Sequence, residues 1–478
     1  MSNSKFRVAL VRTFSQSEYK EPAEPLGIEA LAAELMHRGI DCCLFDRELH
    51  SLESESKSIL DYDPSLVGLS VMMEDNAPDA MRLLLRLRRQ KPTLKFVVGG
   101  LFVTASFPQA RAFFPADCEL VSGEGEIPLT KICFEMMKKE VPETPSQYLN
   151  PPQWQWLHRP NLRDYLHIGA PINMRSSRGC PGKCKFCATP HLPGDLGKWR
   201  GRPIADVADE MEVLCSKYEP HAFNFVDDDF GPLSRVEELT RELAERGLRC
   251  ALSLQLRAST LLSAQDLPQV MARLKAGGLC RVFIGLESFD ADTLRYFNKP
   301  LEPLKAINAF KAVRDSGVAI HIGYILWHLR STMDSVRKEA KQLRDSGFFT
   351  TKIVMSRLQL FPGCGLQMER EEKTPWKLPL DEEFNSISQA IAPLYDAWLI
   401  GAIDVPRQYC LSFLEGGNGA AAKKVRLIEE QLGKLDELAY AAIMDLNSAS
   451  PETVQRASYE AKENFREIGC AFDSSRRS

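Results

Sequence analysis

One short cysteine-rich segment constrains the fold of this chain more than any other part of it: RGCPGKCKFCATP, residues 178–190. Cys180, Cys184 and Cys187 follow the spacing C-x3-C-x2-C, and the glycines and proline around them predict a tight loop. Three thiolates can bind three irons of a [4Fe-4S] cluster and leave the fourth iron open, whereas structural zinc sites usually have four protein ligands. The alternatives are a zinc knuckle, for which His191 is the nearby fourth ligand, or three unrelated buried cysteines.

Strand-like and helix-like segments alternate before this loop. Over the first 140 residues, short apolar runs at 6–14, 42–46, 66–73, 95–100 and 118–123 are separated by amphipathic stretches such as 27–39 and 80–90. Such alternation predicts a parallel, doubly wound, Rossmann-like sheet, in which ligands bind beyond the carboxyl ends of the strands. The residues expected at those ends are Ser70, Gly99, Gly100, Gly123 and Glu124.

The same alternation resumes at the cysteine loop and predicts six strand-helix repeats. The expected strands are 173–179, 222–230, 250–259, 281–288, 319–326 and 351–361. Six repeats predict a partial (β/α)6 barrel with its active site at the carboxyl ends of the strands. We therefore expect a domain at 1–140, a linker at 141–171 packed by Trp154 and Trp156, a barrel at 172–373 and a small helical domain at 374–478.

The cysteine loop resembles that of the radical S-adenosylmethionine (radical SAM) superfamily, whose signature is C-x3-C-x-aromatic-C, with Phe186 as the aromatic residue. The resemblance implies that S-adenosylmethionine binds the open iron of a [4Fe-4S] cluster and is cleaved to a 5'-deoxyadenosyl radical. The upstream runs EPLGIEALAAEL, VGLS, VVGG and SGEGE resemble the cobalamin-binding domain of cobalamin-dependent radical SAM enzymes. The D-x-H-x-x-G motif is absent from the sequence, which implies cobalamin bound without a histidine below the cobalt.

The resemblance also assigns roles to residues at the strand ends. Asp227 and Asp228 follow the second strand, where the family places acceptors for the methionine ammonium group; an exposed acidic turn is the alternative. Gln255 and Arg257 share one face of the third strand, and Arg257 resembles the arginine near the ligand carboxylate. Glu287 occupies the position near the ribose and amino group, although a simple salt bridge would also explain it or Arg257.

Two later parts of the barrel are less clearly assigned. Tyr324 ends the fifth strand, where adenine or the substrate could be bound. The family's glycine-proline-glycine-glutamate-threonine turn after this strand is replaced by LWHLRSTMDSV, so Trp327, His328 and Arg330 could face a particular substrate or form a surface loop.

Composition limits the possible partners. The net charge of -4 predicts no nucleic-acid binding, and the basic run at 82–91 is typical of the solvated face of a helix. No apolar run approaches the roughly 20 residues of a membrane span, and the N-terminus lacks the layout of a signal peptide. With 13 cysteines outside any disulfide framework, we expect a cytoplasmic protein.

Together these patterns predict a cobalamin-dependent radical SAM enzyme. The leading hypothesis is a C-methyltransferase that acts on an unactivated carbon of a small-molecule biosynthetic intermediate through the 5'-deoxyadenosyl radical and methylcobalamin. A low-potential electron donor such as flavodoxin or ferredoxin is the expected protein partner. The alternatives are cyclisation or rearrangement without methyl transfer, a tRNA methylthiotransferase, whose extra cluster Cys42, Cys43, Cys118 and Cys133 do not match well, and a non-catalytic iron-sulfur protein.

Overall fold

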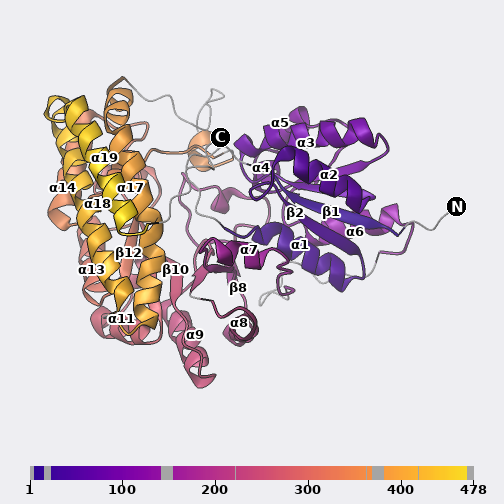
Figure 1. Cartoon of the computed structure of the whole chain (residues 1–478), viewed down its shortest axis with the longest axis horizontal. Coiled ribbons are helices and arrows are strands. Elements are labelled where there is room, and N and C mark those ends of the chain that lie inside the picture. The colour runs from indigo at the N-terminus through magenta and orange to yellow at the C-terminus, as the bar shows by residue number, and fades with distance from the viewer. Residues whose placement is uncertain are drawn as a thin grey trace. The chain divides into compact units, whose positions relative to one another are not determined.

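The computed structural model describes residues 5–14, 23–141, 154–220, 222–361, 363–368, 382–417 and 419–470. The chain forms two compact units. The first comprises residues 1–181, 187–203 and 361–365, and the second comprises residues 182–186, 204–360 and 366–478. The elements of both units are labelled in Figure 1. Residues 142–153 of the predicted linker and the predicted limit at 373–374 lie outside the described residues.

The first unit is built on a parallel five-stranded sheet, as the sequence predicts. Its strands are β1 Arg7–Arg12, β2 Asp41–Asp46, β3 Leu66–Ser70, β4 Lys95–Gly99 and β5 Glu119–Leu120, in the order β2-β1-β3-β4-β5. The helices of this unit are α1 Leu26–His37, α2 Leu52–Tyr62, α3 Ala77–Gln90, α4 Leu101–Ala105, α5 Phe107–Phe113, α6 Glu126–Met136 and α7 Leu162–His167. Two short 3-10 turns, η1 Glu74–Asn76 and η2 Thr189–His191, complete the helical elements.

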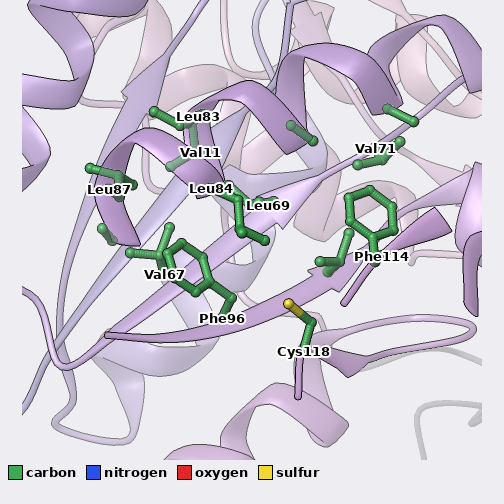
Figure 2. Packing of buried hydrophobic residues seen from close by; sticks show 14 of the residues in the cluster. Val11, Val67, Leu69, Val71, Leu83, Leu84, Leu87, Phe96, Phe114 and Cys118 are labelled. Carbon is green, nitrogen blue, oxygen red and sulfur yellow. The ribbon is translucent and has the colours of Figure 1, made fainter. Parts of the chain in front are cut away.

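Alternate residues of each strand point to opposite faces, so the sheet has a hydrophobic core on each side. Val8 and Leu10 of β1 pack with residues of α1 and α6. Ala9 and Val11 pack with residues of α2, α3, α4 and α5. Figure 2 shows the second core, including Leu83, Leu84 and Leu87 of α3. The basic run is therefore confirmed as helical up to Gln90. Leu83, Leu84 and Leu87 face the core, whereas Leu85 is 45% exposed and the Arg82 side chain is 54% exposed.

The second unit contains the parallel strands β9 Phe223–Phe225, β10 Leu252–Arg257, β11 Leu279–Glu287 and β12 Ala319–Tyr324, in the order β12-β11-β10-β9. The helices before and between these strands are α8 Ile204–Tyr218, α9 Leu233–Glu245, α10 Ala258–Leu262, α11 Leu267–Ala276, α12 Ala291–Tyr296 and α13 Pro303–Asp315; α14 Met333–Ser346 follows β12. In β11 the apolar residues Val282, Ile284 and Leu286 are fully buried, whereas their neighbours Arg281, Phe283, Gly285 and Glu287 are half-buried. This alternation separates a fully buried face of the strand from a half-buried face.

Two of the predicted strands differ from the structure. The stretch 173–179 divides into β6 Ile172–Met174 and β7 Ser177–Arg178, and β7 forms an antiparallel pair with β8 Arg200–Gly201. The stretch 351–361 begins as a helix, α15 Thr351–Val354, and only an isolated bridge joins Arg357 to Trp327. Asp436 of the C-terminal helix α18 (Ala420–Met444) accepts hydrogen bonds from the amide (2.6 Å) and hydroxyl (2.7 Å) of Thr351, so a tertiary contact overrides the β propensity of the sequence TKIV.

The predicted C-terminal helical region is confirmed. It contains α17 Glu382–Leu414, α18 Ala420–Met444, η3 Leu446–Ser448 and α19 Pro451–Glu467, after the short α16 Gly365–Met368. A Cβ at Gly401 of α17 would lie 2.6 Å from the ring of Phe465 of α19, so glycine permits these helices to approach closely. Of the helices in the described residues, none combines the length and apolar character that crossing a membrane requires.

Candidate active site

The first half of the cysteine loop is held in a β-hairpin of the first unit. Strands β7 and β8 pair Arg178 with Arg200, and the amide of Cys180 donates to the carbonyl of Gly197 (3.1 Å). Gly179 has φ +75°, and a Cβ there would collide with the carbonyl group of Lys198. Only glycine fits this turn, so the position of Cys180 depends on it.

The middle of the loop, residues 182–186, is held by the segment that follows α12 in the second unit. The amide of Lys185 donates to the carbonyl of Phe297 (2.9 Å), and the Asn298 side chain donates to the carbonyl of Lys183 (2.7 Å). The ring of Phe186 meets the ring of Phe297 edge to face, with centroids 5.3 Å apart. The aromatic residue of the motif therefore packs against Phe297, which the sequence analysis did not identify.

The three cysteines of the loop have the chemistry that an iron-sulfur cluster needs. Cys180, Cys184 and Cys187 are half-buried, and none of them is in a disulfide. In the described part of the chain, no three His, Cys, Asp or Glu side chains converge on a site for a single metal ion. A cubane places its thiolates on three different irons, so they need not converge as the ligands of one ion do. An all-thiol donor set on a held loop fits such a cluster.

The carboxyl edge of the first unit's sheet brings together four of the predicted residues. Ser70 and Gly99 are partners across β3 and β4, and Gly100 follows directly. Gly100 has φ +110°, and a Cβ there would lie 2.8 Å from the carbonyl carbon of Val71. Gly123, with φ +93°, donates its amide to the hydroxyl of Thr104 (2.9 Å). Three of these four positions are glycines, so the chain carries no side chain at them.

One residue at this edge was missed from the sequence. Met72, two residues after β3, is 50% exposed. Methionine adapts its shape to apolar surfaces, so Met72 is suited to contact a macrocyclic ring. The available signal was the run VMM, which continues apolar residues beyond the end of the strand.

A buried polar network lies beside this sheet in the first unit. Arg159 forms an ion pair with Glu24 (2.7 Å) and donates to the carbonyl of Asn173 (2.7 Å), while the Asn173 amide donates to Glu24 (2.9 Å). Burial and the charge of Glu24 raise the pKa of Glu29 well above its usual value. These contacts connect Arg159 of the predicted linker and Asn173 just after it to Glu24, two residues before α1, and no sequence motif marked them.

Glu124, predicted to bind a cofactor, is instead bonded to arginines. Its carboxylate pairs with Arg178 (2.8 Å) and Arg200 (2.6 Å), the two residues that face each other across β7 and β8. The neighbouring Glu126 also pairs with Arg178. Glu124 has therefore been placed with the hairpin of Cys180, and its predicted contact with a cofactor stays a prediction.

Arg257 and Glu287 lie on the half-buried face of the second unit's sheet, at the ends of the adjacent strands β10 and β11. Arg257 is the strand partner of Gly285, and Glu287 ends β11 two residues later. Glu287 has φ +72°, a strained conformation for a residue with a side chain, and it pairs with Lys299 (2.9 Å). A Cβ at Gly285 would lie 2.7 Å from the Lys299 ammonium nitrogen, so the ion pair lies over this glycine.

The acidic turn after β9 lies beside the same strand end. Asp227 is buried and Asp228 is exposed. Burial raises the pKa of Asp229, an effect that its bond from the Gly231 amide and the charge of Arg257 partly offset. The amide of Phe230 donates to the carbonyl of Gln255 (2.9 Å). Asp229, which is not among the predicted ligands, thus lies beside Gln255 and Arg257 of β10, and the predicted contacts of Asp227 and Asp228 with a ligand stay predictions.

Tyr324 is buried in a different network. Its hydroxyl is bonded to the carboxylate of Glu339 on α14, which also accepts from the hydroxyl of Ser288 (2.8 Å) and the amide of Phe289 (3.1 Å). Burial raises the pKa of Glu339. These bonds direct the Tyr324 hydroxyl to α14, and a ligand contact from it stays a prediction.

The loop after β12 packs inward in part. The His328 ring meets Phe297 at 5.4 Å, and burial lowers the pKa of His328 to about 4. Trp327 is buried, and Arg330 lies over the ring of Tyr296, 3.7 Å from its centroid. Because Phe297 touches both Phe186 and His328, the loop after β12 supports the cysteine loop through one aromatic residue.

Two family models match this chain. The Radical SAM superfamily matches residues 174–344, and the B12 binding domain matches residues 17–132. The chain belongs to the cobalamin-dependent radical SAM enzymes. Its cofactors are accordingly a [4Fe-4S] cluster, S-adenosylmethionine and cobalamin.

Known relatives of this radical SAM enzyme include proteins with different named activities. An uncharacterized methyltransferase of Pyrococcus horikoshii is 23% identical over 66% of this chain and 72% of its own length. A hopanoid C-3 methylase of Methylococcus capsulatus is 26% identical (63% and 61%), and an anaerobic magnesium-protoporphyrin IX monomethyl ester cyclase of Synechocystis is 24% identical (63% and 64%). The chain thus spans between 61 and 72% of the length of these relatives.

The fold has a counterpart among solved structures. The cobalamin-dependent S-adenosylmethionine radical enzyme OxsB, solved with aqua-cobalamin bound, superimposes with a TM-score of 0.70 at 15% identity. The match covers 97% of this chain and 79% of that chain. This confirms the predicted fold class, a Rossmann-like cobalamin-binding region, a radical SAM barrel and C-terminal helices.

Proposed function

We propose that this radical SAM enzyme transfers a methyl group from cobalamin to an unactivated carbon atom of a small molecule. The observation that carries the proposal is the joining, within the first unit, of the hairpin that bears Cys180 to the turn that follows β5. That turn lies at the carboxyl edge of the sheet in the region that matches the B12 binding domain. The hopanoid C-3 methylase among the relatives agrees with methyl transfer to carbon.

The residues of the chain suit the parts that this reaction requires. When bound, the cluster supplies the electron that cleaves S-adenosylmethionine, and cobalamin supplies the methyl group. Cys180, Cys184 and Cys187 would hold the cluster. The planar guanidinium of Arg257 would bind a ligand carboxylate with two hydrogen bonds, and Glu287 would accept bonds from ligand amino or hydroxyl groups.

The aspartates and the glycine edge would complete the two binding sites. Asp227 and Asp228 would accept hydrogen bonds from the ammonium group of S-adenosylmethionine, because their turn follows β9, the strand that pairs with β10. Ser70, Gly99, Gly100 and Gly123 would lie along the corrin ring, with Met72 supplying an apolar contact. The ranges 1–140, 172–373 and 374–478 remain our proposed domain limits.

Ring formation is the second candidate, because a magnesium-protoporphyrin IX monomethyl ester cyclase is among the relatives. Incubating the reduced enzyme and candidate small molecules with S-adenosylmethionine labelled in its methyl group separates the two functions. Methyl transfer places the label in the product. Deoxyadenosine formation with an unlabelled, altered product would establish cyclisation or rearrangement instead.

Replacement of one cysteine tests the cluster assignment. We expect Cys184→Ala to lose cluster iron and to lower deoxyadenosine formation by at least about 100-fold, because the thiolate is a direct iron ligand. Cys43→Ala, which removes a half-buried thiol of β2, is the matched control and should retain both properties. Deoxyadenosine formation at the wild-type rate by Cys184→Ala would reject the assignment of the triplet.

We further propose that a flavodoxin or ferredoxin supplies the electron. The assay replaces the chemical reductant by either reduced protein and measures deoxyadenosine. Formation that depends on the added reduced protein supports the proposal. No formation with either reduced protein, from enzyme that is active with the chemical reductant, contradicts it.

A further inference from the structure

The contact between the hairpin of Cys180 and the turn after β5 is made by a cluster of charged and aromatic side chains in the first unit. This cluster consists of Glu124, Glu126, Trp154, Arg175, Arg178 and Arg200, and we call it the arginine cluster. Arg178 pairs with both glutamates, Arg200 pairs with Glu124 at 2.6 Å, and Arg175 lies 4.0 Å from Glu126. The guanidinium carbons of Arg178 and Arg175 lie 4.4 and 4.8 Å from the centroid of the Trp154 ring.

The arginine cluster is shielded from water. The charged side chains are between 4 and 17% exposed. Ion pairs at this depth lose hydration that their attraction only partly replaces, so they are poor evidence of a role in stability alone. These contacts do fix the orientation of the segments that carry the arginines, because a planar guanidinium group that pairs with a carboxylate and stacks on an indole can take few orientations.

The arginine cluster joins two segments that carry different cofactor assignments. Arg178 is two residues before Cys180, and Arg200 is its partner across the hairpin. Glu124 and Glu126 belong to the turn between β5 and α6, at the carboxyl edge of the sheet. The segment that returns from the cysteine loop packs there too, since a Cβ at Gly123 would lie 3.3 Å from the side chain of Leu196.

We propose that Glu124 and Glu126 are positioning residues, which hold the hairpin of Cys180 in a fixed place against the cobalamin-binding edge. The proposal rests on the proposed function and replaces the predicted cofactor contact of Glu124 with a role exerted through Arg178 and Arg200. A carboxylate that already accepts from two guanidinium groups has its oxygen lone pairs largely occupied. The role of the Glu124 carboxylate is therefore to fix the orientation of the hairpin that carries Cys180.

The chemistry explains why such a fixed place matters. A carbon radical formed with one cofactor must be reached by a methyl group held on the other, so both must be presented in one geometry. A misplacement of about 1 Å between reacting groups costs roughly 100-fold in rate. Flexibility in the hairpin would therefore separate radical formation from methyl transfer.

The test measures the geometry directly and needs no substrate. The full chain is reconstituted with iron and sulfide, loaded with hydroxocobalamin and reduced so that the cluster and Co(II) are both paramagnetic. Electron paramagnetic resonance then reports the magnetic coupling between the two centres. Glu124→Gln and Glu126→Gln are compared with Glu135→Gln, which removes the same charge from an exposed position on α6.

We expect one well-defined coupling in the wild type and in Glu135→Gln, and a broadened or shifted coupling in Glu124→Gln and Glu126→Gln, with iron and cobalamin contents unchanged. An identical coupling in all four proteins would overturn the proposal. Loss of cobalamin from Glu124→Gln alone would also overturn it, because Glu124 would then be a direct cofactor contact. Should either variant fail to take up iron, Trp154→Phe serves as the second test and is expected to broaden the coupling. A wild type that binds neither cofactor would instead reject the proposed function.

Discussion

Replacing Gly100 by alanine adds one atom to the edge that we propose binds cobalamin. The residue has φ +110° and ψ -178°, a conformation that is almost exclusive to glycine and costs other residues about 1–3 kcal/mol. The new Cβ would also collide with the main chain of Val71, which cannot rotate away as a side chain could. Displacing such packed atoms costs about 1–3 kcal/mol more. We therefore expect Gly100→Ala to lower the free energy of unfolding of the first unit by about 2–6 kcal/mol.

The assay is thermal unfolding followed by circular dichroism, with cobalamin absorbance after desalting as a second measurement. A loss of this size lowers the midpoint by roughly 5 °C or more for a unit of this length, and less cobalamin should be retained. Gly27→Ala is the matched control, because Gly27 is near the start of α1 and a Cβ there meets nothing within 4 Å. It should raise stability by about 0.4–1 kcal/mol. If Gly100→Ala unfolded at the wild-type midpoint, the assignment of a glycine-dependent edge would be refuted.

Three further predictions concern other contacts. Lys299→Met leaves the strained, half-buried Glu287 unpaired and should lower the free energy of unfolding in urea by about 1–3 kcal/mol. The control Lys305→Met removes a lysine that is 68% exposed and should change this free energy by less than about 1 kcal/mol. Equal effects of the two changes would contradict a stabilising role of the Glu287–Lys299 pair. Although burial opposes ionisation, Arg178 and Arg175 lower the pKa of Glu126 from 4.5 to about 2. Its carboxylate should therefore contribute about 3 kcal/mol to the free energy of unfolding above pH 5, and this contribution is lost as the pH falls toward 2. A Glu126→Gln variant with the wild-type acid unfolding profile would rule this out. Gly401→Ala places a Cβ 2.6 Å from the ring of Phe465 and should lower the free energy of thermal unfolding by about 1–3 kcal/mol. The control Gly433→Ala on α18, with open space around it, should be neutral or stabilising. If Gly433→Ala were the more destabilising of the two, α17 and α19 would not be closely packed.

Local patterns were sufficient for the first unit's sheet. Each apolar run formed a strand because its neighbours along the chain are helices that cover both faces, as Val8 and Val11 illustrate from a single strand. Local patterns gave the wrong prediction at Thr351–Val354, where β-branched residues form a helix. Asp436, far along the chain, accepts hydrogen bonds from Thr351, the first residue of this helix. Sequence periodicity carries no record of such a contact.

The candidate site was predictable where chemistry is written into residue type and spacing. The cysteine triplet and the glycines at the strand ends are of this kind. The partners of Glu124 could not be predicted, because Arg178 and Arg200 lie 54 and 76 residues away in the sequence. The sequence alone does not distinguish an arginine that forms such a pair from one that is exposed to solvent. Phe297 also escaped notice, because its contact with Phe186 depends on how α12 ends.

The way residues 182–186 are held has a consequence for how this loop evolves. Lys183 and Lys185 meet Asn298 and Phe297 through main-chain atoms, a carbonyl oxygen and an amide, which nearly every amino acid possesses. Natural variation at these two positions should therefore be wide, whereas Asn298 and Phe297 should change rarely among proteins that share this reaction. A census of orthologous chains that ranked tolerance to substitution along the loop would show that order.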